Sequence, residues 1–296
     1  MSIGPLDDEV VEKYRQAGDA LRTVLDEAAE MVEPGRRHLE VAEYAEERID
    51  ELADGPAFPV NISVDEEASH ATPARDDERE FGEEMVCLDV GVHVDGYIAD
   101  AAVTVDHSGH PDLVEAAEEA LDAAIERVGP GVETGEVGAI IEETIRSYDY
   151  NPVLNLSGHG VERWDAHTGP NVPNRGVERS VEFEVGDVVA IEPFATDGRG
   201  KVSEGHAEEI YSLENERTVR NRQARQVLEQ VTERYRTLPF AARWIDVPRA
   251  DIAIRRLKQQ DVLHGYPVLK EEEGRFVSQA EHTVIVTEDG CEVTTA

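Results

Sequence analysis

Residues 87–103, CLDVGVHVDGYIADAAV, decide the fold. Two apolar runs flank Asp95-Gly96, a dipeptide typical of the two-residue turn of a β-hairpin. With this turn, position 100 faces position 91, so Asp100 lies on the same face of the hairpin as Asp89 and diagonally across from it. Two carboxylates this close cannot both be anionic without a cation nearby. One of them could be protonated or paired with Arg, but neither strand contains Arg, so the hairpin favours a metal site.

Two other apolar stretches also carry an acid. Glu192 lies in VVAIEPF, residues 188–194, and Glu281 lies in SQAEHTVIV, residues 278–286; we expect both stretches to be strands. A surface acid is uninformative in a chain with 65 Asp and Glu, whereas an unpaired buried carboxylate is costly. Glu192 and Glu281 are therefore candidates for the same site as the two hairpin acids.

The chain contains an internal repeat. Amphipathic helices are predicted over 7–31 and 38–53 and again over 111–127 and 134–148, each pair being broken by Pro-Gly. An offset of 96 positions aligns the two pairs with twelve identities in twenty-five positions. An α-α-β-β unit used twice predicts an α+β fold, with a pseudo-two-fold antiparallel sheet covered by helices. A site at the pseudo-axis would take its residues from both halves.

Three histidines extend the candidate site. His159 stands between glycines in SGHG, His167 follows eight residues later, and His70 occupies the repeat-related position in the first half. Two Asp, one His and two Glu form a donor set suited to two divalent ions such as Mn, Fe, Co or Zn. Because metal coordination lowers the pKa of water to about 7, this set predicts hydrolysis at neutral pH.

The composition is strongly acidic, with 65 Asp and Glu against 28 Lys and Arg and a formal net charge of −37. The charge is spread along the chain, which favours a halophilic, salt-adapted surface over an acidic interaction tail. It also disfavours anionic membranes and specific nucleic acid as partners. Two cysteines and the lack of a long apolar run indicate a cytoplasmic protein.

Residues 213–263 differ from the rest of the chain. They hold eleven basic and seven acidic residues and are largely helical. We interpret them as a helical insertion subdomain, with 1–212 and 264–296 forming the main domain. A winged helix that binds nucleic acid is an alternative, but the segment has no base-reading signature, so packing and local charge balance are favoured.

The ordered set Asp89, Asp100, His159, Glu192 and Glu281, with its flanking strands, resembles the archaeal type 2 methionine aminopeptidases, metallopeptidases of the pita-bread fold. The resemblance covers essentially the whole chain. It implies a dinuclear centre in which Asp89 binds one metal ion and His159 and Glu192 bind the other. Asp100 and Glu281 would bridge the two ions, whose identity among Co, Mn, Fe and Zn stays open.

The same resemblance assigns roles to the substrate side of the site. His70 would contact the scissile amide nitrogen, and His167 would stabilise the developing oxyanion or orient the substrate carbonyl. Glu192 would shuttle the proton of the bridging water. The resemblance also implies that Phe58, Ile210 and Tyr266 line the pocket for the methionine side chain, although each could be plain core packing.

Spacing points to the subtype. Eighty-nine positions separate Glu192 from Glu281, room for the insertion that type 1 enzymes lack. The implied function is removal of the initiator methionine from nascent proteins with a small second residue, at the ribosome, by a monomer. A proline-directed aminopeptidase or dipeptidase is the alternative enzyme, but those relatives carry an additional N-terminal domain. A relative that has lost its ligands and binds protein or nucleic acid is the other alternative, which retention of all five ligand types disfavours.

Overall fold

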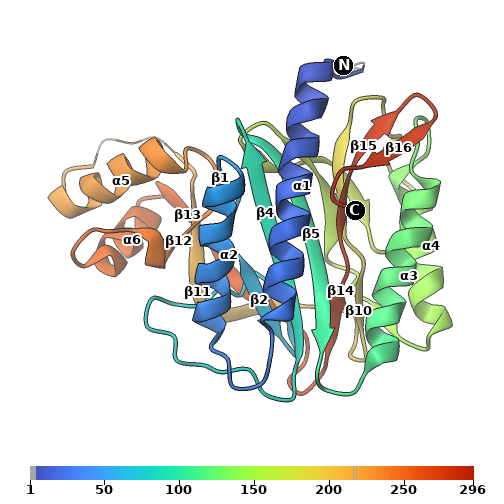
Figure 1. The fold of residues 1–296 in the computed structure, drawn as a ribbon, viewed down its shortest axis with the longest axis horizontal. Helices are drawn as coiled ribbons and strands as arrows, with labels where there is room; N and C mark the ends of the chain where they lie inside the picture. The colour runs from blue at the N-terminus through green and yellow to red at the C-terminus, as the bar shows by residue number, and fades with distance from the viewer. Residues whose placement is uncertain (1–4, 216, 218) are drawn as a thin grey trace.

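The computed structural model describes residues 5–215, 217 and 219–296 (Figure 1). The predicted main domain and insertion also include residues 1–4, 216 and 218, which lie outside the described residues. None of the helices in the described part of the chain is long and apolar enough to cross a bilayer.

Four long helices form where the repeat predicts them. They are α1 (Asp8–Glu30), α2 (His38–Leu52), α3 (Pro111–Arg127) and α4 (Thr134–Ser147). Both connections turn through glycine with positive φ, +89° at Gly35 and +78° at Gly131, a conformation that glycine adopts at little cost. The Pro-Gly signal therefore locates the break in each pair correctly.

The acid-bearing hairpin has the predicted register. Strand β4 (Met85–Val94) pairs with β5 (Tyr97–Asp106), and Gly91 is the direct partner of Asp100. The two turn residues both have positive φ, 51° at Asp95 and 84° at Gly96, as the tight hairpin turn requires. Strands β1 (Gly55–Pro56) and β2 (Asn61–Val64) pair with β4 to complete this sheet.

The second half of the chain builds a five-stranded antiparallel sheet in the order β16-β15-β9-β7-β8. Its strands are β7 (Ser157–Glu162), β8 (Asp165–Pro173), β9 (Val188–Ile191), β15 (His282–Thr287) and β16 (Gly290–Val293). A separate three-stranded sheet contains β6 (Asn151–Pro152), β10 (Phe194–Thr196) and β14 (Val277–Gln279). In sequence, these strands are the neighbours of β7, β9 and β15.

The two apolar stretches expected to be single strands are both interrupted at their acids. Residues 188–196 divide into β9 and β10 at Glu192-Pro193, where proline lacks the N–H that a ladder needs. Residues 277–287 divide into β14 and β15 at Ala280-Glu281, and Glu281 forms an isolated bridge with Ala102 of β5. The strands of the described residues consequently form four hydrogen-bonded sheets and not one continuous sheet.

Each helix pair covers its own half of the core, as the pseudo-two-fold prediction requires. Side chains of α1 and α2 pack on β2, β4 and β5, whereas those of α3 and α4 pack on β9 and β15. Figure 1 shows α1 and α2 in front of the first sheet and α3 and α4 to their right, at the edge of the view. The protein thus has the antiparallel sheets and outer helices of the predicted α+β pita-bread fold.

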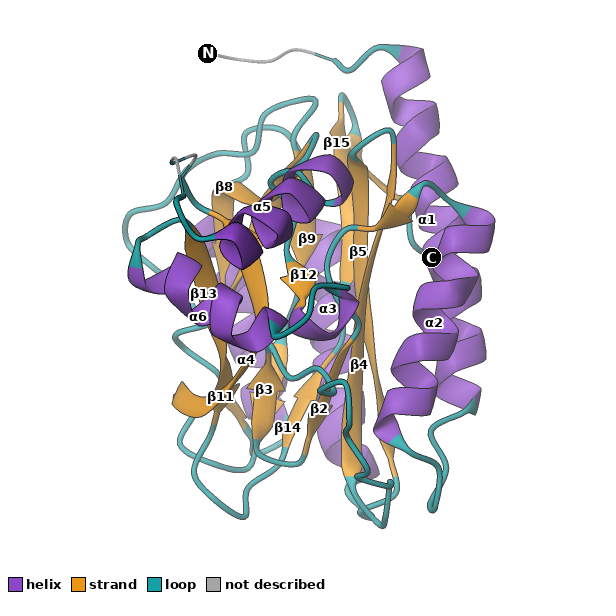
Figure 2. Ribbon diagram, turned by 90° about the vertical axis from the view of Figure 1, so that its left-hand side faces the viewer, coloured by secondary structure: helices purple, strands orange, loops and turns teal. Residues whose placement is uncertain are grey.

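Residues 213–263 contain α5 (Arg222–Arg234), the short helix η1 (Ala242–Trp244) and α6 (Ala250–Gln259). The segment has an apolar cluster of its own, in which Val227 and Val231 meet Ile254 and Leu257. The cluster lies on the outer side of the sheet that runs β12-β11-β13-β3 (Figure 2). Those strands are β3 (Glu67–Ser69), β11 (Ser203–Leu213), β12 (Phe240–Ala241) and β13 (Leu263–Lys270). The sequence predicts none of the four, and β12 lies inside the segment expected to be largely helical.

Candidate active site

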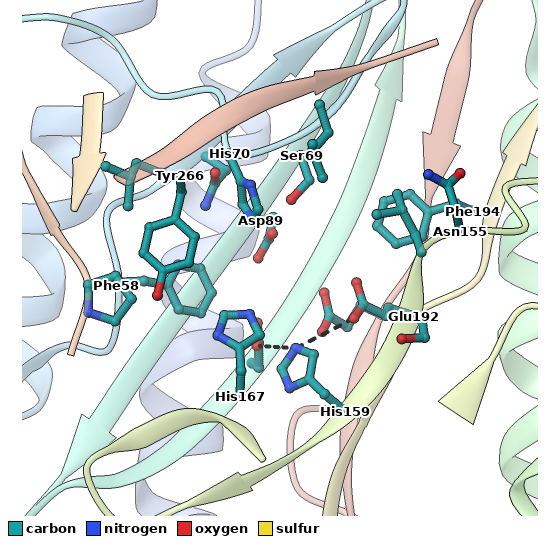
Figure 3. A pocket seen from close by; sticks show the side chains of 18 residues that line it. Phe58, Ser69, His70, Asp89, Asn155, His159, His167, Glu192, Phe194 and Tyr266 are labelled. Carbon is teal, nitrogen blue, oxygen red and sulfur yellow. Dashed lines mark ion pairs between the residues drawn. The ribbon is translucent and has the colours of Figure 1, made fainter. Parts of the chain in front are cut away.

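One cavity of about 260 Å³ gathers every site residue that the sequence indicates. Its lining includes the four acids and one histidine proposed as ligands together with the five further residues assigned to substrate: Asp89, Asp100, His159, Glu192, Glu281, Phe58, His70, His167, Ile210 and Tyr266. These side chains come from ten different strands and connections, spread from Phe58 to Glu281. Figure 3 shows Asp89, His159 and Glu192 at the centre, with His70 and Tyr266 to one side.

Hairpin and strand geometry bring the candidate ligands together. Asp89 and Asp100 stand on β4 and β5, and His159 on β7 is the direct partner of Ala190 on β9, two residues before Glu192. The bridge between Glu281 and Ala102 sets Glu281 beside the strand that carries Asp100. The halves of the repeat therefore meet at these residues.

Three of the five candidate ligands have donor atoms close enough to share a metal ion. One donor atom each of Asp100, His159 and Glu281 lie within 4.8 Å of one another, and all three residues are buried. Nε2 of His159 lies 3.5 Å from Oε1 of Glu192 and 3.9 Å from Oδ2 of Asp100 (Figure 3). One buried carboxylate oxygen of Asp89 and one of Asp100 have no hydrogen-bond partner among the described residues. Orphaned oxygens beside a neutral imidazole fit the donor preference of a divalent cation.

Burial and mutual repulsion disfavour the ionised form of the carboxyl groups in the site. Burial, followed by the charges of neighbouring carboxylates, raises the pKa of Asp100 and Glu281 well above the usual range. Burial and the charge of Asp89 do the same for Glu192, and burial raises the pKa of Asp89 to about 7. Burial lowers the pKa of His159 to about 3, so its ring is neutral and has a lone pair for a metal. A cation among these groups would reverse the preference of the carboxyls for protons.

Hydrogen bonds with Thr283 hold the backbone of Asp100, and Thr283 is in turn bonded to Thr295. The Asp100 N–H donates to Oγ1 of Thr283 at 2.8 Å, and the Thr283 hydroxyl donates back to the Asp100 carbonyl at 2.8 Å. Thr283 in turn donates its N–H to Oγ1 of Thr295 at 3.1 Å. These reciprocal bonds between β5 and β15 hold the two halves at the site.

Sequence reasoning missed Gln279, which is 2% exposed. The side-chain NH2 of Gln279 donates to Oε2 of Glu281 at 2.9 Å and to Oε2 of Glu192 at 3.4 Å. The side-chain Oε1 of Gln279 accepts from Sγ of Cys87 at 3.1 Å. Two residues apart on an extended chain, Gln279 and Glu281 point to the same side. The spacing Gln-x-Glu in an apolar stretch is the signal that could have found it.

The substrate side of the cavity is built from aromatic and imidazole rings. His70 follows β3, and its Nδ1 lies 3.3 Å from the carbonyl oxygen of Pro267. The His70 ring meets the edge of Tyr266 at 5.4 Å between centroids, and His167 lies 4.4 Å from His159. Burial lowers the pKa of His70 to about 4, so this ring is also neutral. His167 is more exposed and stands at the mouth of the cavity.

Apolar side chains form the remaining wall. The ring of Phe58 packs on Gly91, so closely that a Cβ at position 91 would lie 2.2 Å from it. Ile210 on β11 is the direct partner of Tyr266 on β13, and Phe58 and Ile210 are buried. Asn61, which the sequence does not indicate, also lines the cavity.

Comparison with known proteins identifies the family of the chain. Residues 12–288 match metallopeptidase family M24. The chain is 51% identical over 291 residues to the methionine aminopeptidase of Archaeoglobus fulgidus, covering 98% of this chain and 100% of that protein.

Solved structures share the fold. A thermophilic Arx1 superposes with a TM-score of 0.85 at 19% identity, over 98% of this chain and 91% of that one. The methionine aminopeptidase of Thermotoga maritima superposes with a TM-score of 0.72 at 25% identity, over 100% of this chain and 99% of that one. The chain therefore belongs to metallopeptidase family M24 and, within it, to the methionine aminopeptidases.

Proposed function

We propose that this chain is a type 2 methionine aminopeptidase that removes the initiator methionine from nascent proteins whose second residue is small. The observation that carries the proposal is the convergence of five metal-ligand side chains and two neutral or solvent-facing histidines on one small cavity with an apolar wall. The methionine aminopeptidase of Archaeoglobus fulgidus, at 51% identity, supports the substrate.

The ligands divide between two divalent ions in this proposal. Asp89 would hold one ion, His159 and Glu192 the other, and Asp100 and Glu281 would bridge them. Co, Mn, Fe and Zn all accept such a mixture of oxygen and imidazole donors. When bound, the ions would supply an activated water at neutral pH and polarise the scissile carbonyl.

His70 has the right protonation to meet the scissile amide. Its Nδ1 faces the carbonyl oxygen of Pro267, which can only accept a hydrogen bond, so the ring proton belongs on Nδ1. Nε2 is then left with a lone pair for the N–H of the bond to be cleaved. His167, at the mouth of the cavity, would donate to the substrate carbonyl as negative charge develops there.

Glu192 is the proposed proton carrier. Its Oε1 lies 3.5 Å from Nε2 of the candidate ligand His159, so a water held at the same site would lie next to this carboxylate, which would take up its proton. The amide of Gln279, 3.4 Å from Oε2, leaves Oε1 toward His159 and the cavity.

The apolar wall suits a methionine side chain. Phe58 and Ile210 are 7% and 3% exposed, and Tyr266 adds a ring whose hydroxyl lies 3.1 Å from Oγ of Ser212. A flexible, polarisable thioether packs well against such rings. The small volume of the cavity favours one such side chain followed by a small residue.

We further propose that the protein works as a monomer in a salty cytoplasm, acting at the ribosome without membrane or specific nucleic-acid binding, and that 213–263 is an insertion subdomain. The net charge of −37 supports salt adaptation, because hydrated carboxylates keep a protein soluble in concentrated salt. Thermal unfolding in dilute buffer and in multimolar KCl tests this. Equal stability in both would contradict it.

Peptide specificity tests the proposed activity. Purified protein, loaded with Mn, Co or Fe in multimolar KCl, should release methionine from Met-Ala-Ser far faster than from Met-Lys-Ser. It should leave Ala-Pro-Ser and a dipeptide ending in proline intact. Faster cleavage of the X-Pro substrates would replace this function by a proline-directed peptidase. Binding of peptide without cleavage, with metal content confirmed, would replace it by a non-catalytic binding role.

A further inference from the structure

Arg243 is a buried cation that none of the site chemistry uses. It lies in η1, within the Arg-rich segment 213–263, and its side chain is 4% exposed. The guanidinium pairs with Oε1 of Glu46 on α2, and Oε2 of the same carboxylate accepts from Nε1 of Trp244 at 2.8 Å. A buried ion pair of this kind contributes little to stability compared with apolar packing, so its position calls for a reason.

The other side of the guanidinium holds the loop that follows His70. Nη1 of Arg243 donates to Oγ1 of Thr72 at 2.8 Å and to the carbonyl of Pro73 at 2.9 Å. The Thr72 hydroxyl donates to the carbonyl of Val60 at 2.7 Å, so the loop is clamped between Arg243 and the strand region before β2. Arg75, farther along the loop, donates to the carbonyl of Ile245 at 2.9 Å and forms a second link to segment 213–263.

His70 sits in a conformation that needs such support. Its φ is +64°, a left-handed value that costs a non-glycine residue of order 1–3 kcal/mol. On one side of His70, Ser69 is held by pairing with Leu269 of β13. On the other side, the Ala71 carbonyl accepts from the Ile62 N–H at 2.6 Å. The residues after His70 thus have to stay in place for the ring to keep facing the cavity.

We propose that Arg243 is a positioning residue for His70, acting through Thr72 and Pro73. Segment 213–263 then contributes to the reaction by holding an imidazole that lies outside the segment, directly after β3. The inference rests on the proposed role of His70 at the scissile amide. A guanidinium suits this arrangement, because two nitrogens of one rigid fork donate to Glu46, Thr72 and Pro73, whereas a lysine ammonium has no such fork.

The test combines activity with a background that lacks His70. Arg243→Lys and Thr72→Val are compared with wild type, and each is also made together with His70→Ala. Thr72→Val keeps the ion pair between Arg243 and Glu46, so it reports on the loop even if Arg243→Lys folds poorly. Arg48→Lys is the matched control, since Arg48 pairs with Glu27 and Glu51 and does not contact the loop.

The readouts are kcat and KM for Met-Ala-Ser with Mn-loaded enzyme, Mn²⁺ affinity by calorimetry without substrate, and the thermal midpoint. We expect Arg243→Lys and Thr72→Val to lower kcat by about tenfold, since misplacement of a contact group by less than an ångström is costly. Mn²⁺ affinity should stay within about twofold of wild type. In the His70→Ala background, both substitutions should change kcat by less than about twofold, because the group that they position is gone.

Three results would overturn the inference. The first is an equal loss of kcat in both backgrounds, which marks a general structural role. The second is a normal kcat for Arg243→Lys and Thr72→Val while His70→Ala is impaired. That result would contradict the positioning role of Arg243 and leave the proposed role of His70 in place. The third is full activity of His70→Ala, which removes the proposed role of His70 and the inference with it.

Discussion

The side-chain amide of Gln279 donates to Oε2 of Glu281 at 2.9 Å, two residues farther along the chain. The same nitrogen lies 3.4 Å from Oε2 of Glu192, which lies eighty-seven positions earlier in the chain. One neutral amide therefore orients two carboxylates that would otherwise repel each other. Groups that hold metal ligands by hydrogen bonds tune affinity almost as much as the ligands do.

Replacing Gln279 should weaken metal binding. We expect Gln279→Leu to lower Mn²⁺ affinity by about 10–100-fold, measured by calorimetry, because both carboxylates lose their donor. Ser278→Ala is the matched control, since Ser278 is buried next to Gln279 and its hydroxyl has no partner among the described residues. Equal affinities for Gln279→Leu and wild type would show that the amide does not hold the ligands.

Removing one site carboxyl should stabilise the metal-free protein while destroying activity. Burial holds the pKa of Asp100 well above its usual 3.8, so the folded state keeps a proton that the unfolded state releases. Wild-type metal-free protein therefore loses stability as pH rises from about 4 through the folded-state pKa. Asp100→Asn has no proton to lose, so its advantage should grow with pH over that range and exceed about 1 kcal/mol.

Thermal unfolding with a chelator, at a series of pH values, measures this difference. Asp26→Asn is the control, because Asp26 is exposed on α1 and should give the same curve as wild type. Added Mn²⁺ should raise the midpoint of wild type but not that of Asp100→Asn. A lower midpoint for metal-free Asp100→Asn would contradict the electrostatic account of the site.

The contact of Phe58 with Gly91 sets the position of the Phe58 ring in the apolar wall. A Cβ at position 91 would lie 2.2 Å from the Phe58 ring, so Gly91→Ala should push the ring into the cavity. We expect KM for Met-Ala-Ser to rise by about tenfold, equivalent to about 1.4 kcal/mol. The double variant Gly91→Ala with Phe58→Leu should recover part of the affinity because leucine is smaller. Unchanged KM in Gly91→Ala would mean that the ring does not border the methionine side chain.

A buried histidine away from the site should make the fold sensitive to mild acid. His38 is 3% exposed, stacks on Phe81 at 4.2 Å, and has no hydrogen-bond partner on either ring nitrogen among the described residues. Burial, helped by the charge of Arg79, lowers its pKa to about 4 from 6.5. Between these values the unfolded chain binds a proton that the folded chain refuses, so stability falls as pH drops from 6.5 to 4.

The contribution of His38 over that window is about 3 kcal/mol. His38→Phe keeps the stacking and removes the titration, so its free energy of unfolding should depend less on pH between 6.5 and 4. His206→Phe, at an exposed position, should retain the wild-type dependence. Parallel curves for wild type and His38→Phe would refute the assignment.

Local signals in the sequence were sufficient for the helices and the acid hairpin. The Pro-Gly breaks locate the four long helices, and a two-residue turn at Asp95-Gly96 fixes the register that opposes Gly91 and Asp100. Register follows from the turn because side chains alternate with a period of two. These features depend on neighbours in sequence, which is why pattern alone predicted them.

Features that depend on distant partners were not predictable in the same way. The strand break at Glu281 arises from its bridge to Ala102, and the amide of Gln279 finds its acceptor Glu192 eighty-seven positions away. The clamp of Arg243 on Thr72 spans 171 positions. The apolar run 278–286 has the local pattern of one strand. Its interruption at Glu281 involves Ala102, a distant residue that the local pattern does not identify.

The residues of the candidate site came from a mixture of chemistry and resemblance. Acids inside apolar stretches pointed to Asp89, Asp100, Glu192 and Glu281 without any relative, because buried carboxylates need a partner. Phe58, Ile210 and Tyr266 had no such signal, since an apolar side chain in a cavity looks in sequence like any core residue. Their common cavity is a product of the fold.

Metal-dependent release of methionine is the decisive measurement for the proposed activity. Protein stripped with a chelator in multimolar KCl is titrated with Mn²⁺, and free methionine from Met-Ala-Ser is measured together with bound metal. We expect no release without metal, release that rises with metal occupancy, and no release from Glu281→Gln at any Mn²⁺ concentration. Full metal occupancy without release from wild type, or normal release from Glu281→Gln, would contradict it.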